Sequence, residues 1–177
     1  MLNNKQVLTK NLIERLNTLK RLLMDELKLH QRLLNIAEEK KNLLVEANNE
    51  SLEGKTLEEH QLLMILSSTA SNRIKILQVI ASELSIKNEQ VTVGEIAREL
   101  PDPYRTTLSK LVIGLKQVMH KSHKINLVNR VLLENSISIA NDFVNTLTKI
   151  VTEQNTYTKK GNGKFSQNMQ IAINEVI

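Results

Sequence analysis

The chain has 177 residues, a formal net charge of +5, five glycines, two prolines, no cysteine and only 2% aromatic residues. The lack of cysteine excludes disulfides and thiolate metal sites, and no apolar run approaches the ~18 residues of a membrane span. Scarce glycine and proline leave few turns, so we predict a few long helices.

The first predicted element is one long helix over residues 4–48, with no Pro or Gly inside it. Its apolar residues recur at helical spacing: Leu12, Leu16, Leu19, Leu23, Leu27, Leu34, Ala37 and Leu44. The polar stretch 48–55 breaks this pattern, and the letters T-L-E-E at Thr56 and Glu59 predict a capping box that starts a second helix. This helix is expected to end near Ile86 and to form an antiparallel hairpin with the first.

Two further helices follow the loop around residues 87–92. A second capping box, Thr92 with Glu95, predicts a short helix through Leu100 that Pro101 stops. The pair Asp102 and Pro103 is another start signal, so a third long helix is expected from Tyr104 to about Glu153. Its predicted apolar stripe is Leu108, Leu111, Leu115, Val118, Ile125, Asn129, Leu132, Ile139, Phe143, Leu147 and Ile150.

The C-terminal part differs in composition, with Gly161 and Gly163 among Asn, Thr and Lys, which indicates a loop or disorder. Beyond it lies a short amphipathic segment with an apolar side of Phe165, Met169, Ala172, Ile173, Val176 and Ile177. The predicted fold is therefore all-α: an elongated antiparallel helical bundle of three long helices plus one short helix in residues 1–153. A flexible C-terminal tail is predicted for residues 154–177.

The chain offers no pattern that is typical of catalysis. A nucleophile beside a base on rigid loops is missing, and the scattered acidic residues are typical of solvated helix faces. His120 and His123 have the i, i+3 spacing of some metal ligands, yet lysines flank them and no third ligand is near. We therefore expect no enzyme activity, no metal and no cofactor.

Residues 92–120 permit a second interpretation, a helix-turn-helix that inserts its second helix into the major groove of DNA. Two prolines in the turn and the few cations of that second helix, such as Arg105, Lys110 and Lys116, argue against it. Asn126 and Asn129 lie one turn apart on the third long helix. We interpret Asn129 as a buried polar residue that fixes helix register, as in coiled coils.

The order of these features resembles the FlgN family of flagellar export chaperones. The resemblance covers most of the chain: a Leu-rich first helix with EEKKNLLVEAN near its end, a second helix, and TVGEIARELP before a long third helix. Its more specific parts are NLVNRVLL, with Asn126, Asn129 and Leu132, and the Tyr-x-x-x-Gly element formed by Tyr157 and Gly161. Thr158 departs from the Asp or Asn that members often carry after that Tyr.

The resemblance implies a cytoplasmic chaperone of the flagellar type III export system. Its expected cargo is the hook-associated proteins of the hook–filament junction, and its expected destination is the export gate, so it meets the membrane only indirectly and binds no nucleic acid. The family places cargo binding in the C-terminal region, which implies cargo contact by Phe165, Met169, Ile173, Val176 and Ile177. It also implicates the Tyr of Tyr-x-x-x-Gly, here Tyr157 with Gly161, in docking on the gate.

The apolar stripe of the tail indicates that the tail packs on another surface. An apolar stripe at the end of a polar tail is expected to pack on a surface, either the chain's own bundle or the terminal helices of a cargo protein. A coiled-coil scaffold with no role in secretion is a third hypothesis, and it predicts self-association without cargo.

Overall fold

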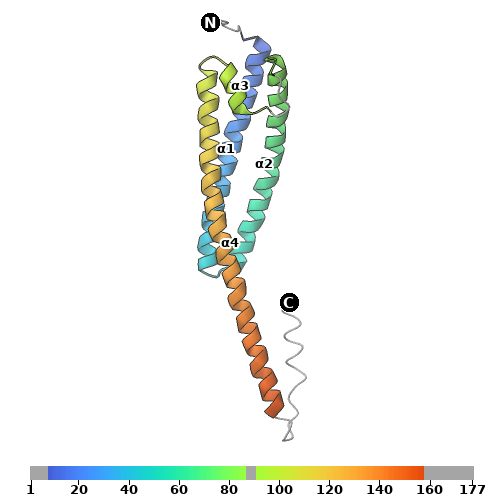
Figure 1. The fold of residues 1–177 in the computed structure, drawn as a ribbon, viewed down its shortest axis with the longest axis vertical. Coiled ribbons are helices and arrows are strands. Elements are labelled where there is room, and N and C mark those ends of the chain that lie inside the picture. The colour runs from blue at the N-terminus through green and yellow to red at the C-terminus, as the bar shows by residue number, and fades with distance from the viewer. Residues whose placement is uncertain (1–7, 87–90, 158–177) are drawn as a thin grey trace. The chain divides into compact units, whose positions relative to one another are not determined.

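The computed structural model describes residues 8–86 and 91–157, the last five of these as backbone only. Within this part of the chain there are four α-helices and no strand: α1 (Lys10–Val45), α2 (Asn49–Glu83), α3 (Val93–Glu99) and α4 (Tyr104–Tyr157), as Figure 1 shows. The prediction of an all-α bundle with three long helices and one short helix is confirmed. The chain forms two compact units, Met1–Leu133 and Glu134–Ile177.

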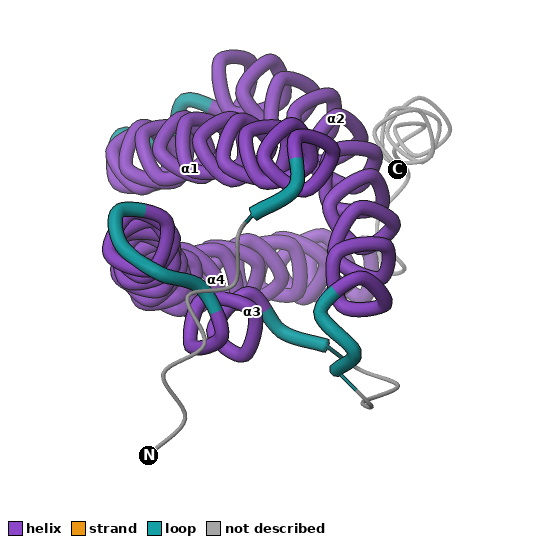
Figure 2. Tube along the Cα trace, turned by 90° about the horizontal axis from the view of Figure 1, so that it is seen from above, coloured by secondary structure: helices purple, strands orange, loops and turns teal. Residues whose placement is uncertain are grey.

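The first unit is built on the antiparallel hairpin of α1 and α2, which pack along each other. Helix α3 packs against α2 and lies between α2 and the start of α4 at one end of the bundle (Figures 1 and 2). The part of α4 up to Leu133 completes this unit.

Helix α1 begins later than the predicted Asn4, because Thr9 provides its cap. Thr9 has an extended backbone, and its side-chain hydroxyl accepts a hydrogen bond from the backbone N–H of Leu12 at 3.2 Å. This bond satisfies one of the N–H groups that the first helical turn leaves unpaired. The helix then runs without interruption to Val45, three residues before the predicted end.

The turn between α1 and α2 is shorter than predicted, and the capping box at Thr56 and Glu59 is wrong. Ala47 has a left-handed φ of 54°, and the N–H groups of Ala47 and Asn48 donate to the carbonyls of Leu44 and Leu43 at 3.4 and 3.0 Å. These two bonds make a Schellman motif, which ends a helix within two residues.

Asn48 then starts α2 directly, because its side chain accepts a hydrogen bond from the N–H of Ser51 at 3.1 Å. Thr56 lies inside α2 and donates its hydroxyl to the Leu52 carbonyl at 2.8 Å. Glu59 instead pairs with Lys40 of α1 at 2.7 Å.

The same device ends α2 at Glu83. Ser85 has a φ of 57°, and the N–H groups of Ser85 and Ile86 donate to the carbonyls of Ser82 and Ala81. This end lies three residues before the predicted one.

The second predicted capping box is present. The Thr92 hydroxyl accepts from the Glu95 N–H at 3.2 Å, while the Glu95 carboxylate accepts from the Thr92 N–H at 2.7 Å. Helix α3 stops at Glu99, and α4 starts at Tyr104 with the Asp102 carboxylate accepting from the N–H of Thr106 at 3.3 Å. Helix α4 then continues through Tyr157, four residues beyond the predicted Glu153.

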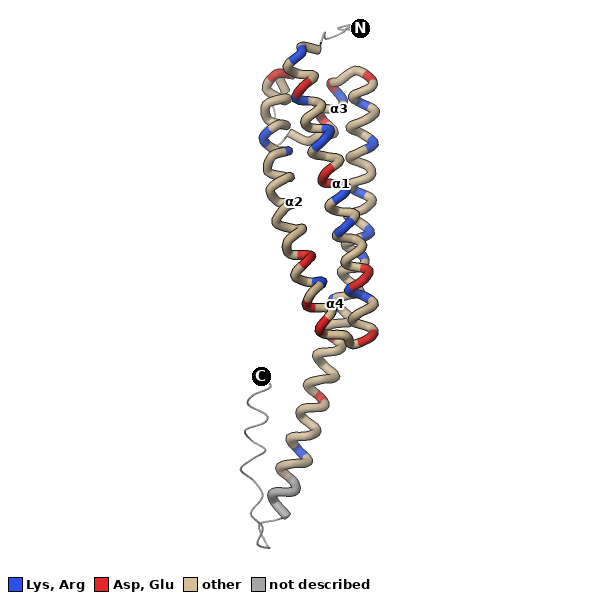
Figure 3. Tube along the Cα trace, turned by 180° about the vertical axis from the view of Figure 1, so that it is seen from behind, with Lys and Arg blue, Asp and Glu red and all other residues tan. Residues whose placement is uncertain are grey.

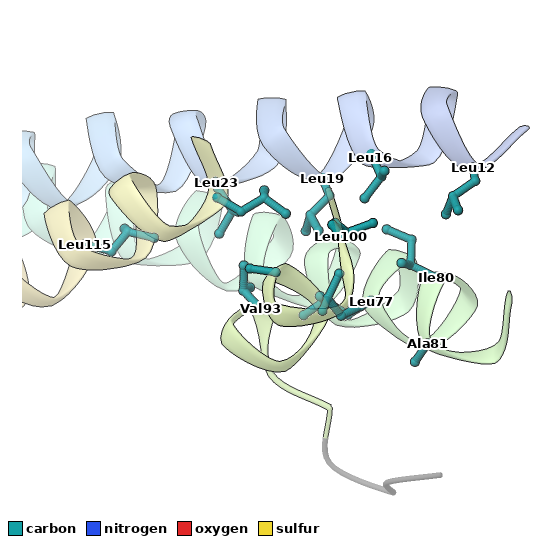
Figure 4. Close-up of a cluster of buried hydrophobic side chains, with 13 residues drawn as sticks. Leu12, Leu16, Leu19, Leu23, Leu77, Ile80, Ala81, Val93, Leu100 and Leu115 are labelled. Atoms are coloured by element: carbon teal, nitrogen blue, oxygen red, sulfur yellow. The ribbon is translucent and has the colours of Figure 1, made fainter. Parts of the chain in front are cut away.

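The core of the first unit joins all four helices at the end where α3 lies (Figure 4). Leu19, Ile80 and Ile96, from α1, α2 and α3, have no exposed side-chain surface. Burial of each such aliphatic side chain contributes roughly 1.5–3 kcal/mol. The cluster of buried residues is Leu12, Leu16, Leu19, Leu23, Leu77, Ile80, Ala81, Val93, Ile96, Ala97, Leu100, Leu108 and Leu115.

A buried ion pair lies midway along the α1–α2 hairpin. Glu26 of α1 is 4% exposed, and its carboxylate accepts a hydrogen bond from the Nε of Arg73 of α2 at 2.7 Å. Elsewhere in the first unit, residues of both charge signs are distributed along the helices (Figure 3). The buried carboxylate needs its partner, because an unpaired charge in an apolar setting is costly.

Candidate functional site

The second unit contains an apolar helix face that no described residue covers. Along α4 beyond Glu134, apolar residues recur every three or four positions, the spacing that places them on one side of a helix. We call this surface the α4 apolar face: Ile137, Ile139, Ala140, Phe143, Val144, Leu147, Ile150 and Val151. All but Val151, which is half-buried, are exposed.

The exposure is large for side chains of this kind. Ile139 keeps 70% and Phe143 keeps 65% of its surface exposed, and Ile137 and Val144 each keep just over half. Single exposed apolar residues are ordinary, but a contiguous apolar stretch marks an interaction surface. The α4 apolar face is such a stretch.

The other side of this part of α4 is polar and carries little charge. On the side away from the apolar residues, four polar residues follow each other at helical spacing: Ser138, Asp142, Asn145 and Lys149. The threonines satisfy their own hydroxyls: Thr146 and Thr148 donate to the carbonyls four residues earlier, at 2.8 and 2.9 Å. These hydroxyls therefore need no hydrogen bond from another protein, whereas the exposed apolar side chains favour a partner that covers them.

The same stripe of α4 has a different environment in the first unit. There Leu108, Leu115 and Val118 are buried, and Leu108 and Leu115 belong to the core. The predicted stripe is thus covered by neighbouring helices in this part of α4. Its later members Ile139, Phe143, Leu147 and Ile150 are exposed, because the periodicity of a helix predicts an apolar face and not what covers that face.

Asn129 is buried in the first unit, where its side-chain Nδ2 donates to the Ala37 carbonyl of α1 at 2.8 Å. Its Oδ1 is buried without a hydrogen-bond partner. This bond ties α4 to a single position along α1. Asn126, one turn earlier, is exposed.

The predicted partner-binding residues lie at or beyond the end of the described chain. Tyr157 is the last residue of α4, with only its backbone described. Gly161, Phe165, Met169, Ile173, Val176 and Ile177 fall outside the described residues. The α4 apolar face, whose stripe the sequence predicts without its exposure, directly precedes them in the chain.

The segment of the helix-turn-helix interpretation is built into the bundle. Val93 and Ile96 of α3 are buried in the core. The Arg105 guanidinium donates to the carbonyls of Arg98 and Leu100, at 3.2 and 3.0 Å, and so holds the connection between α3 and α4. These contacts give the segment a structural role.

Histidines and carboxylates form no metal site in the part of the chain that the structure describes. His120 and His123 are both exposed on α4. Burial lowers the pKa of the His30 imidazole below its ordinary value of 6.5, and the nearby Glu26 carboxylate partly opposes this shift. His30 therefore lies near the buried ion pair of the hairpin. Among the described helices, none combines the length and the apolarity that a membrane crossing requires.

Comparison with known proteins gives one match. The family described as FlgN protein matches residues 15–164, which include the whole described part of α4 and most of α1. This match confirms the resemblance that the sequence motifs predicted. No curated protein and no solved structure matches the chain.

Proposed function

The chain belongs to the FlgN family of flagellar export chaperones, and from this membership we propose its specific function. The protein binds hook-associated proteins of the hook–filament junction in the cytoplasm and keeps them unassembled. It then delivers them to the export gate of the flagellar secretion system.

The observation that carries this proposal is the α4 apolar face. A chaperone that holds an assembly protein needs an apolar surface that stays available until its cargo arrives. Phe143, Ile139 and Leu147 offer such a surface on a single helix. An amphipathic helix of the cargo fits this surface, with residues at i, i+3, i+4 and i+7 packing along it.

We assign the second part of the cargo surface to the tail, through Phe165, Met169, Ile173, Val176 and Ile177. These residues share the amphipathic spacing of the α4 apolar face and follow it closely in the chain. Ordering a short segment on binding costs conformational entropy, which favours a releasable complex. Release is required of a chaperone that gives up its cargo at the gate.

The gate contact is assigned to Tyr157 and Gly161, which lie between the two parts of the cargo surface. This placement allows cargo to be held on both sides while the aromatic ring between them engages the gate. A Tyr ring combines a large apolar area with a polar hydroxyl, as is common at protein interfaces.

The test of the cargo surface is a deletion. The chain lacking residues 166–177 is titrated with a hook-associated protein by isothermal calorimetry, with the full chain as the control. We expect at least tenfold weaker binding. The circular dichroism spectrum of the truncated chain is expected to keep the helical signal of α1 to α4. Undiminished binding by the folded truncation contradicts the tail assignment.

The gate assignment is tested by Tyr157→Ala, with Thr156→Ala as the neighbouring control. Tyr157→Ala is expected to retain cargo and lose export of the hook-associated protein, measured in the culture supernatant. Loss of cargo binding instead shows that the two roles are wrongly assigned. The helix-turn-helix alternative predicts an affinity for DNA that falls steeply as the salt concentration rises. Apolar packing on the cargo predicts an affinity for the hook-associated protein that persists at high salt.

A further inference from the structure

The positive charge of the chain is concentrated on one stretch of α4. Residues 1–101 contain fourteen basic and fourteen acidic side chains, so their charges cancel. Residues 103–133 contain six basic side chains and no acidic one. A stretch of this length without an acidic residue is unlike the mixed charge of a solvated helix face. This part of α4 therefore favours an anionic partner.

Several of these cations lie on one side of α4. Lys110, Lys121 and Lys124 recur at helical spacing, which places them on the same side of the helix, and all three are exposed. Lys121 lines a groove between α1 and α4, and Lys28 of α1 lines it too. In the part of the chain that the structure describes, none of these four lysines forms an ion pair with a carboxylate.

The groove between α1 and α4 has an apolar floor and basic edges. Leu34 and Val118 are buried and Leu27 is half-buried, whereas Lys28 and Lys121 are exposed. The groove has a volume of about 430 Å³. Its lining spans two turns of each helix, or roughly 10 Å at ~1.5 Å per residue. A short stretch of a partner helix fits this length.

Gly114 keeps the groove open. It lies inside α4, where glycine weakens a helix relative to alanine. The packing of α4 on α1 does not require this glycine, because a Cβ added to it would meet the Leu27 methyl groups at 3.7 Å, an ordinary van der Waals distance. The missing side chain instead allows another chain to approach the floor of the groove closely.

The residues of the groove distinguish among anionic partners. None of the residues that line it is aromatic, so a nucleic-acid base has no side chain on which to stack. A flat lipid surface does not reach the floor between two helices. An amphipathic helix does, with its apolar residues on the floor. Acidic residues beside them then face the lysines, as at the e and g positions of a coiled coil.

We propose that the groove between α1 and α4 binds an acidic amphipathic helix of a protein other than the cargo. Aliphatic residues of that helix pack on Leu27, Leu34 and Val118, and its carboxylates pair with Lys28 and Lys121. The groove lies in the first unit, and the proposed cargo surface lies in the second. This binding therefore uses different residues from cargo binding and does not rest on the proposed function.

A synthetic helix tests the groove. The probe is a labelled, stapled peptide of about two heptads, with leucine at a and d and glutamate at e and g. A matched peptide carries lysine at e and g. Fluorescence anisotropy with the full chain is expected to show at least tenfold tighter binding of the glutamate peptide. The double variant Lys28→Glu, Lys121→Glu is expected to reverse this order. Equal affinity of the native chain for the two peptides would overturn the proposal.

The matched control is the double variant Arg21→Glu, Lys116→Glu. It makes the same charge change at exposed positions of α1 and α4 that do not line the groove. We expect it to weaken binding of the glutamate peptide less than threefold. Equal losses in the two double variants would overturn the proposal, because the attraction would then come from net charge alone.

The role of Gly114 is tested by Gly114→Ala. This variant is expected to unfold at a higher urea concentration than the native chain, because alanine favours the helix. It is also expected to bind the glutamate peptide about threefold more weakly, since the added methyl group narrows the groove. A lower unfolding midpoint would show that the packing of the helices requires the glycine, which contradicts its role in the groove.

Other occupants of the groove give different results. If Lys28→Glu, Lys121→Glu weakens a hook-associated protein tenfold, the groove belongs to the cargo surface and the proposal is overturned. Vesicles of phosphatidylglycerol that bind the native chain, with no binding of the glutamate peptide, overturn it in favour of lipid. A native dimer that this variant dissociates overturns it in favour of a second copy. A chain that binds the glutamate peptide and no hook-associated protein overturns the proposed function and leaves the groove proposal standing.

Discussion

Replacing Phe143 by alanine tests the role of the α4 apolar face. The Phe143 side chain is 65% exposed, and a Phe buries on the order of 200 Å² when it is fully enclosed. A partner helix that encloses the remainder removes about 130 Å² from water. At ~25 cal/mol per Å² this contributes about 3 kcal/mol, or roughly a hundredfold in Kd.

The assay is isothermal calorimetry of Phe143→Ala with a hook-associated protein, beside urea unfolding of the same variant. Lys149→Ala, on the polar side of the same helix, is the matched control and is expected to change the Kd less than threefold. Because Phe143 lies outside the core, its loss is expected to change the free energy of unfolding by about 0.5 kcal/mol or less. Unchanged affinity would refute the reasoning, and so would a large loss of stability.

Three further predictions concern the first unit, and urea unfolding checks each of them. Ala47→Gly is expected to raise the free energy of unfolding by about 1 kcal/mol, because glycine adopts the left-handed conformation of this turn without strain; a lower value contradicts the assigned cap. Arg73→Ala is expected to cost about 3–5 kcal/mol by leaving a buried carboxylate unpaired, whereas Arg15→Ala, from a more exposed pair, costs about 1 kcal/mol or less. The lowered pKa of His30 means that the unfolded chain binds the extra proton first, so this contribution to stability is lost progressively as pH falls below 6.5. His30→Gln is expected to lose less stability than the native chain between pH 7.5 and 5.5, and equal losses contradict the assignment.

Caps decide how much of the helix layout the sequence predicts. The Thr92 and Glu95 box starts α3 as its pattern indicates. The same pattern at Thr56 and Glu59 lies inside α2, where Glu59 pairs with Lys40 of α1. A local motif cannot show that a side chain has a better partner in another helix.

The ends of α1 and α2 were predicted too late for a different reason. Helices commonly end on a left-handed glycine, and here Ala47 and Ser85 take that conformation. Their φ values are opposed by the side chain and are maintained by the hydrogen bonds of the Schellman motifs and the packing of the hairpin. Without glycine at these positions, the sequence placed both helix ends three residues late.

The sequence predicts the amphipathic pattern of the α4 apolar face, but it does not predict that this face is exposed. The stripe of α4 repeats in the same way from Leu108 to Ile150, so its amphipathic character follows from the sequence. Leu115 is buried and Ile139 is exposed, although both continue the same stripe. The difference depends on where neighbouring helices pack, which is a property of the tertiary structure.

We propose that the C-terminal half of α4 and the tail hold the cargo, while the α1–α2 hairpin serves as the frame. Hydrogen–deuterium exchange of the full chain with and without a hook-associated protein tests it most directly. We expect slower exchange on cargo binding in residues 134–177 and unchanged exchange in α1 and α2. Protection confined to residues 92–120 or to the α1–α2 hairpin, with none beyond Glu134, would contradict it.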